Sequence, residues 1–195
     1  MKAIKLISTV LVITALIATP MAAMAGKGKA KTSTSPTPAT CSFCVATPLS
    51  PEQITELKWM REEEKLARDV YTDMATMYAD NIFKNIAASE QEHFDAIGEK
   101  LVLYGIEDQD PAADTAAGEF TEQELQELYN DLVDKGSISR KDALEVGVII
   151  EEQDIVDIEA ALLGLTSKPL ILTYKHLLSG SESHLAAFTR LLDRL

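Results

Sequence analysis

Residues 86–97 have the sequence IAASEQEHFDAI, and the spacing within it decides the fold. Positions four, three and four residues apart lie on one face of an α-helix. In this segment those positions are Ile86, Glu90, His93 and Ile97. The outer pair is apolar and indicates contact with a hydrophobic core, whereas the inner pair consists of residue types that ligate metals. The segment therefore predicts a core helix with a carboxylate and an imidazole buried halfway along it.

The composition of the whole chain favours an all-α domain. The 195 residues are 46% hydrophobic but only 6% aromatic, and β-branched runs are sparse after the first twenty positions. Ala, Leu, Glu, Asp and Lys dominate the remainder, and most of these residues favour helices. The length allows one domain of roughly 150 residues with appended segments.

The net charge of −13 argues against binding to nucleic acid. Proteins bind phosphate backbones through Lys and Arg, which displace counterions, but here 18 such residues stand against 31 Asp and Glu. An acidic surface instead attracts cations and favours solubility.

Residues 1–25 have the three parts of a secretory signal peptide. Lys2 and Lys5 form a basic start, residues 6–19 are apolar, and residues 23–25 (Ala-Met-Ala) form a small-residue cleavage site. The apolar run is shorter than the ~20 residues that a membrane-spanning helix needs. We therefore expect a secreted or cell-envelope protein, with an uncleaved N-terminal anchor as the less favoured alternative.

Residues 26–48 are rich in Lys, Ser, Thr and Pro, which predicts a flexible linker. The linker contains both cysteines of the chain, Cys41 and Cys44. Outside the cytoplasm, a local disulfide between them is the expected state.

Caps and helix breakers divide residues 49–195 into five predicted helices. Ser50, Pro51 and Gln53 form a capping box that starts the first one. The predicted helices span residues 51–79, 81–104, 121–136, 139–163 and 167–195. Tight turns join the first two and the last two, whereas more than thirty residues join these two pairs. Two antiparallel hairpins and one long crossover, here with a short extra helix, make up a ferritin-like four-helix bundle.

The core-facing stripe of each long helix is interrupted near its middle by metal-ligand residue types. In chain order they are Glu64, Glu90 and His93, Glu151 and Asp154, and His184. A rise of ~1.5 Å per residue places them within one or two helical turns of a common level. Burying four carboxylates together is strongly destabilising, and two divalent cations would neutralise them. We therefore expect a two-metal centre, which iron, manganese or zinc could occupy.

Other interpretations of these residues stay open at the level of sequence. Arg61 and Arg68 flank the stripe of the first helix and could form metal-free salt bridges with the carboxylates. Glu152 replaces Glu151 as a ligand if the helix register is shifted by one residue. His184 alone could be a core histidine with a hydrogen-bond partner.

Several charged or polar residues near the stripes are predicted to lie outside the site. Glu62, Glu63 and Glu92 are expected to be solvated surface charges, and His176 lies off its stripe and is expected to be exposed. Tyr71 is expected in the core, where it could become a hydrogen-bond or redox partner of the site.

Four phrases resemble known helical metalloproteins. EKLARDVY at 64–71 and ASEQEH at 88–93 are similar to the first-helix and second-helix ligand segments of rubrerythrins. Together with ALEVGVIIEEQDIVDIE at 143–159 and LLSGSESHLAAF at 177–188, they resemble the "domain of unknown function 2202" family of the ferritin-like superfamily. The resemblance implies a di-iron centre that reacts with dioxygen or peroxide. By position it implies the ligands Glu64, Glu90, His93, Glu151 and His184.

Two departures from rubrerythrins bear on that implied function. The last helix has Ser181-x-x-His184 in place of Glu-x-x-His, and Asp154 is the candidate that compensates for the missing carboxylate. No rubredoxin-like four-cysteine domain is present in this sequence, so an electron donor would be a separate protein. The sequence leaves three alternative functions: a di-iron oxidase or peroxidase, a non-catalytic envelope metal binder or store, and a metal-free helical interaction module.

Overall fold

The computed structural model describes residues 48–106, 110, 112 and 115–195. These residues form five helices and no strand, so the predicted all-α class is confirmed. The helices are α1 (Pro51–Tyr78), α2 (Asn81–Tyr104), α3 (Gln123–Gly136), α4 (Arg140–Leu163) and α5 (Lys168–Leu192). The predicted signal peptide and linker, with Cys41 and Cys44, lie outside the described residues apart from Pro48.

A side-chain cap starts α1 where the sequence predicts, whereas α3 starts two residues after its predicted start and has no side-chain cap. The Ser50 hydroxyl accepts a hydrogen bond from the Gln53 backbone, and the Gln53 side chain accepts one from the Ser50 backbone. Ala79 adopts a left-handed conformation (φ 50°) that ends α1, and the next residue, Asp80, caps α2. Because only these two residues separate the helices, α2 must reverse direction at once.

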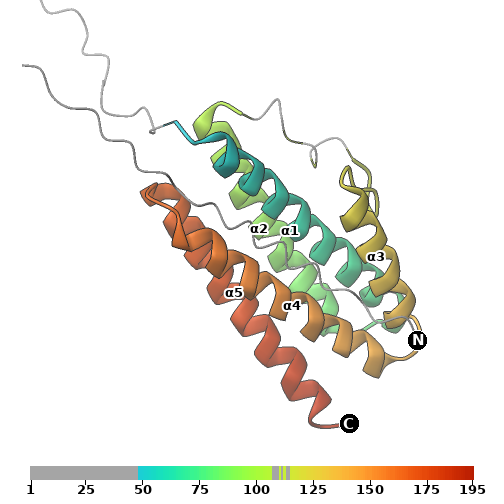
Figure 1. Cartoon of the computed structure of the whole chain (residues 1–195). Helices are drawn as coiled ribbons and strands as arrows, with labels where there is room; N and C mark the ends of the chain where they lie inside the picture. Colours follow the sequence, from blue (N-terminus) through green and yellow to red (C-terminus); the bar gives the residue numbers. More distant parts are fainter. Residues whose placement is uncertain (1–47, 107–109, 111, 113–114) are drawn as a thin grey trace, which may run out of the picture. The chain divides into compact units, whose positions relative to one another are not determined.

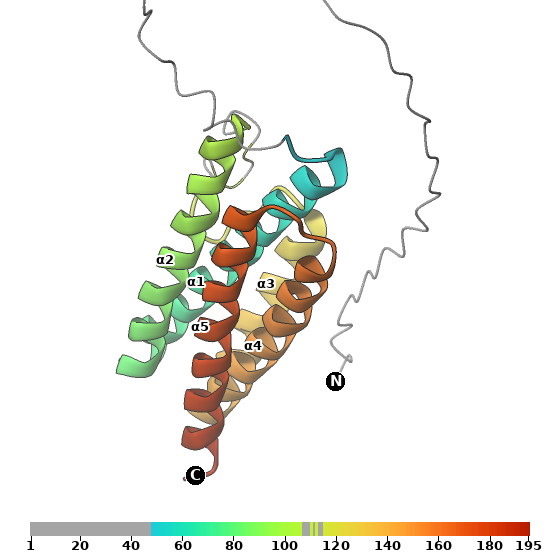
Figure 2. The same ribbon diagram turned by 90° about the vertical axis from the view of Figure 1, so that its left-hand side faces the viewer.

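The four long helices form two antiparallel pairs. Figure 1 shows α1 beside α2 and α4 beside α5, with α3 lying against α1 and α4. The view turned by 90° shows the four long helices side by side along one general direction (Figure 2). The long connection between α2 and α4, which contains α3, joins the two pairs.

Two apolar clusters fill the interior at different levels of the bundle. One contains Val70, Phe83, Leu144 and Phe188 among others. The other contains Met60, Ile97, Ile158 and Leu177 among others. Each long helix contributes to both clusters, and its predicted ligand residues fall between the two contributions. The polar residues therefore meet in one layer that is enclosed by apolar layers.

Buried charges on another side of α1 bind the crossover segment. Glu62 accepts hydrogen bonds from the backbone N–H (3.0 Å) and the hydroxyl of Thr121. Lys65 donates to Asp69 at 3.0 Å and to two crossover carbonyls. Glu62 is only 1% exposed, so its prediction as a solvated charge is wrong. The crossover covers this side of α1, which helix periodicity alone treats as surface.

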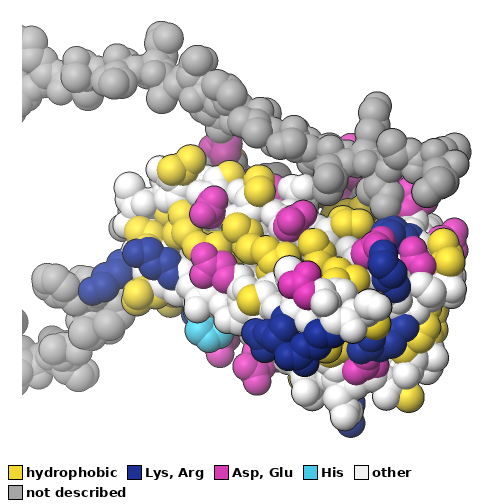
Figure 3. Space-filling view, turned by 90° about the horizontal axis from the view of Figure 1, so that it is seen from below, with side chains coloured by type: hydrophobic (Ala, Val, Ile, Leu, Met, Phe, Trp, Pro, Cys, Tyr) yellow, Lys and Arg dark blue, Asp and Glu magenta, His cyan; other side chains and the backbone are white. Residues whose placement is uncertain are grey.

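The outer surface is mixed in charge, and no described helix is apolar over a length that could cross a bilayer. Figure 3 shows acidic and basic side chains around a band of apolar ones on one face. Glu92 and Glu152 are exposed, which confirms the prediction for Glu92 and places Glu151, not Glu152, on the buried side of α4.

Candidate metal centre

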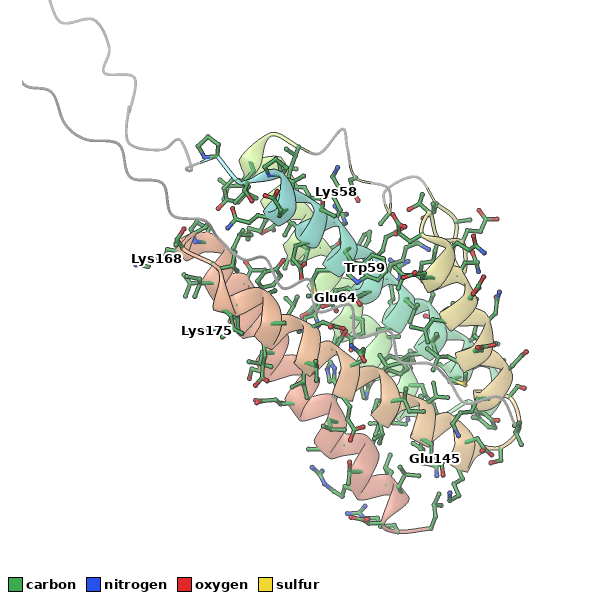
Figure 4. The ribbon with its side chains drawn as sticks, in the orientation of Figure 1. Lys58, Trp59, Glu64, Glu145, Lys168 and Lys175 are labelled. Carbon is green, nitrogen blue, oxygen red and sulfur yellow. The ribbon has the colours of Figure 1, made fainter. Side chains whose placement is uncertain are left out.

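The first triad of candidate ligands consists of Glu64 from α1 and Glu90 and His93 from α2. The Nδ1 atom of His93 lies 3.2 Å from Glu64 Oε2 and 2.8 Å from Glu90 Oε2. One ligand atom from each residue lies within 4.8 Å of the other two, close enough to hold one ion. All three are almost completely buried. Figure 4 shows Glu64 midway along the bundle, whereas Lys168 and Lys175 lie at its periphery.

The second triad consists of Glu90 from α2, Glu151 from α4 and His184 from α5. The Nδ1 atom of His184 lies 2.8 Å from Glu90 Oε1 and 3.5 Å from Glu151 Oε2. These three residues also offer ligand atoms within 4.8 Å of one another. The arrangement therefore has a second position for one ion.

Glu90 belongs to both triads and presents one oxygen to each. Its Oε2 faces His93 and its Oε1 faces His184. A carboxylate with one oxygen toward each of two positions has the geometry of a bridge between two ions. The two triads therefore share Glu90 and form one connected cluster, the candidate centre.

Asp154 lies next to this centre without completing either triad. Its side chain is 5% exposed, and its Oδ2 atom has no hydrogen-bond partner. Burial, together with the charges of Glu64, Glu151 and Glu90, raises the pKa of Asp154 well above its usual value. A nearby cation would relieve both effects.

Burial makes two of the carboxyl groups weak acids. It raises the pKa of Glu64 to about 8, although the hydrogen bond to His93 opposes the shift. It also raises the pKa of Glu151 to about 7, against the hydrogen bond to His184. Burial thus favours the protonated form of both groups when no metal is bound.

The pKa values of the two imidazoles and of Glu90 shift in the direction opposite to the effect of burial alone. Burial lowers the pKa of His93, but its carboxylate partners outweigh this effect and raise the pKa to about 10. In the same way, Glu151 and Glu90 raise the pKa of His184 to about 9. Burial raises the pKa of Glu90, but hydrogen bonds to His184 and His93 lower it to about 2. An ionised Glu90 and protonated His93 and His184 therefore stabilise one another.

Two buried carboxylate oxygens of the centre, Glu64 Oε1 and Asp154 Oδ2, lack a hydrogen-bond partner. The Glu90 oxygens, Glu151 Oε2 and His184 Nδ1 have contacts only within the imidazole–carboxylate pairs. Buried polar atoms are almost always satisfied in native proteins, so unpartnered ones require an explanation. Oxygen and imidazole nitrogen suit iron, manganese and zinc, and the donor set therefore fits two such ions.

The two arginines that could neutralise the carboxylates pair elsewhere. Arg61 forms an ion pair with Asp110 (2.5 Å) and lies over the Phe94 ring. Arg68 pairs with Asp69 (2.8 Å) and donates to Gln91. The salt-bridge alternative that uses these arginines is therefore wrong for the described residues.

Two hydroxyl groups orient the ligands from outside. The Tyr71 hydroxyl donates a 2.6 Å hydrogen bond to Glu151 Oε1, in line with its predicted place beside the site. The Ser89 hydroxyl lies 3.1 Å from His184 Nε2. Such contacts fix the orientation of a ligand side chain and its tautomer. Sequence reasoning missed Ser89, because its partner is 95 residues away and no local pattern signals the contact.

Two of the residues predicted to lie outside the site are closer to it than expected. His176 is exposed as predicted, but its ring lies edge-on to the His93 ring at 5.8 Å. Glu63 was expected in solvent, but it is only partly exposed and its Oε2 is buried without a hydrogen-bond partner, so that prediction holds only in part. Burial and the charge of Asp157 raise the pKa of Glu63 well above its usual value, against a hydrogen bond from Trp59.

The fold and the site define a helical-bundle protein with a buried cluster of carboxylates and histidines. Residues 53–194 match the family described as "Uncharacterized protein domain (DUF2202)", and the chain belongs to this family. The matched range includes all six candidate ligands. The resemblance to this family that the sequence phrases indicate is confirmed.

A similar protein and a similar solved structure come from one archaeon. The chain is 43% identical over 146 residues to "Uncharacterized protein MJ0754" of Methanocaldococcus jannaschii. The aligned residues cover 75% of this chain and 78% of the relative. The crystal structure of "hypothetical protein MJ0754 from Methanococcus jannaschii" matches with a TM-score of 0.73 and 42% identity. That match covers 76% of this chain and 83% of the other.

Proposed function

We propose that this protein is a ferritin-like four-helix bundle that binds two divalent metal ions, with iron as the native metal. The shared position of Glu90 between the two triads is the observation that supports this proposal most directly. Glu64 and His93 would hold one ion, and Glu151 and His184 the other. Asp154 would supply a further oxygen near both.

Charge balance supports two ions rather than one. Glu64, Glu90, Glu151 and Asp154 have four negative charges when ionised, and two divalent cations balance them. The described arginines beside the site, Arg61 and Arg68, are already paired. Lys65 is committed to Asp69 and to the crossover carbonyls.

We further propose that the iron-loaded protein reacts with dioxygen or peroxide. A pair of iron ions supplies two electrons to such an oxidant. The chain itself positions the ligands: Tyr71 holds Glu151, Ser89 holds His184, and the two apolar clusters exclude bulk water. Electrons for repeated turnover would come from a separate donor protein. The signal-like residues 1–25 favour a site of action outside the cytoplasm.

A second candidate is a non-catalytic metal binder or store of the cell envelope. The enclosure of the first triad favours this role, since Glu64, Glu90 and His93 are at most 1% exposed. Such a site admits a substrate less readily than an open one. In this role zinc or manganese could replace iron.

Metal analysis of the full chain, purified from iron-supplemented cells, tests the proposal. We expect about two ions per chain in the wild type, and less than half of that in Glu90→Gln. Glu92→Gln is the matched control, because this residue is exposed two positions further along α2. Equal metal content in all three proteins would remove the site.

Turnover assays then separate the two candidate roles. Oxidation of ferrous ion or consumption of peroxide in proportion to bound iron supports an oxidase or peroxidase. Two bound ions without turnover above background support the binder. A protein without bound metal, whose melting temperature a chelator leaves unchanged, supports the metal-free module.

A further inference from the structure

Gly180 stands in the middle of α5, where glycine is an unfavourable residue. The helix runs from Lys168 to Leu192 without interruption. Glycine in a helix interior destabilises the helix relative to alanine, because glycine loses more backbone freedom on folding. A glycine retained at such a position requires a packing reason.

That packing reason is the ring of His93. A Cβ atom at position 180 would lie 2.5 Å from His93 Nε2 and 2.6 Å from its Cε1. Atoms that are not bonded do not approach so closely, so one of the two groups would have to move. The distance from the same Cβ to His184 Cε1 would be 3.9 Å, an ordinary contact.

His93 cannot move without losing its place in the first triad. Its Nδ1 is held at 2.8 Å by Glu90 and at 3.2 Å by Glu64. Its ring also lies 5.8 Å from the rings of His184 and His176, on α5. The ring is thus confined between two carboxylates and the surface of α5, and a methyl group at position 180 would take up its space.

We propose that Gly180 is a positioning residue that allows the Glu64–Glu90–His93 half of the centre to form. This inference depends on the proposed two-metal function. Its consequence is selective: a side chain at position 180 removes the ligand atom of His93 from the first triad. The same side chain leaves Glu90, Glu151 and His184 in place. Gly180 therefore determines whether the centre holds two ions or one.

Other glycines of the bundle do not have this relation to a ligand. A Cβ at Gly98 would meet the Arg61 guanidinium, and one at Gly136 would meet the Met74 thioether, both at the ends of flexible side chains. At Gly147 it would meet the Phe188 ring, which is part of an apolar cluster. At Gly164 it would meet nothing within 4 Å, which makes this position a matched control.

Titration of the chelator-treated full chain with Co²⁺ tests the inference, with bound metal measured after desalting. We expect two ions in the wild type and in Gly164→Ala, but one in Gly180→Ala. Two ions in Gly180→Ala would overturn the inference and leave the proposed function intact. No bound ion in the wild type would instead overturn the proposed function.

Melting of the metal-free variants shows whether Gly180 acts through His93. We expect Gly180→Ala, as a single substitution in the otherwise wild-type protein, to lower the melting temperature. In the His93→Ala background the same change should raise it, because the ring is gone and alanine favours the helix. An equal loss in both backgrounds, or failure of both variants to fold, would show a purely structural glycine and overturn the inference.

Discussion

Two groups of buried charge lie on different sides of α1 and differ in how their charges are satisfied. In the crossover cluster, which consists of Lys65 and Asp69, the two side chains pair with each other and with crossover backbone groups. The other oxygen of Asp69 pairs with Arg68. In the centre, Glu64 and its neighbours include buried atoms without hydrogen-bond partners. Burial costs the same kind of desolvation energy in both places. The comparison indicates that the first group stabilises the fold by itself, whereas the second requires protons or metal ions.

Of the tests of this comparison, removal of the metal is expected to have the largest effect on the stability of the protein. An ion that binds only the folded protein, at a free concentration of 1,000 times its Kd, stabilises it by about 4 kcal/mol. Calorimetry with and without a chelator should therefore show a large fall in melting temperature for the wild type. Glu90→Gln should show little dependence on metal. A wild-type melting temperature that is independent of chelator contradicts a metal requirement.

Lys65→Met should destabilise the protein by about 3 kcal/mol whether or not metal is present. The change removes one of the two cationic partners of Asp69 and the donor to the carbonyls of Ala116 and Glu119, but no candidate ligand. Denaturant unfolding measures the loss. Lys141→Met is the control, since this lysine is 62% exposed and solvent screens its pair with Glu145. If both variants lose the same stability, or if Lys65→Met loses metal, the two groups are not independent.

The stability of the metal-free protein should fall as the pH rises from about 4.5 to about 10. Glu64, Glu151, His93 and His184 have folded-state pKa values of about 8, 7, 10 and 9, above their ordinary values of 4.5 and 6.5. The folded protein thus holds protons that the unfolded chain has lost, and each such proton contributes a slope of about 1.4 kcal/mol per pH unit. The lowered pKa of Glu90 acts in the opposite direction, but only below pH 4.5.

Bound metal should reverse this pH dependence, because the ions displace the same protons. The difference in melting temperature between loaded and chelated protein should therefore widen with pH. Thermal melts at several pH values check both trends. A chelated protein that gains stability between pH 6 and pH 9 would falsify the proposed protonation of the centre.

Tyr71→Phe is expected to have the smallest effect, about 1 kcal/mol of stability and roughly a tenfold loss of metal affinity. The change removes the hydroxyl that donates to Glu151. Tyr129→Phe is the matched control, because its hydroxyl donates to Asp73, outside the centre, at 2.5 Å. Metal titration should distinguish the two variants even if their unfolding free energies are equal. Equal metal affinities would exclude a role for Tyr71 in orienting Glu151.

Helix boundaries and the core level of the candidate ligands were predictable from sequence because both depend on local rules. Ser50 caps α1 as predicted, α4 starts within one residue of its predicted start, and α2 ends at the predicted Tyr104. Helical spacing placed Glu64, Glu90, His93, Glu151, Asp154 and His184 on buried faces, and all six are buried. Periodicities of three and four residues are enough to define a face.

Contacts between distant segments were not predictable in this way. Glu62 and Glu63 lie on sides of α1 that periodicity assigns to solvent. In the structure, Thr121 donates a hydrogen bond to Glu62, and Glu63 lies in a partly buried position near Asp157. The partners of Arg61 and Arg68 were likewise decided by what packs beside them. One helical stripe reports one buried face and contains no information about a second.

The sequence by itself determined five helices, their hairpin order and a polar layer halfway along the bundle. These follow from caps, from loop lengths and from residue spacing, all of which act over a few residues. Only the tertiary structure decided that Glu90 is shared by two triads, that Ser89 contacts His184, and that Gly180 leaves room for His93. The last two relations depend on the packing of α2 against α5. Ser89 and His184, for example, are 95 positions apart, and no local rule connects them.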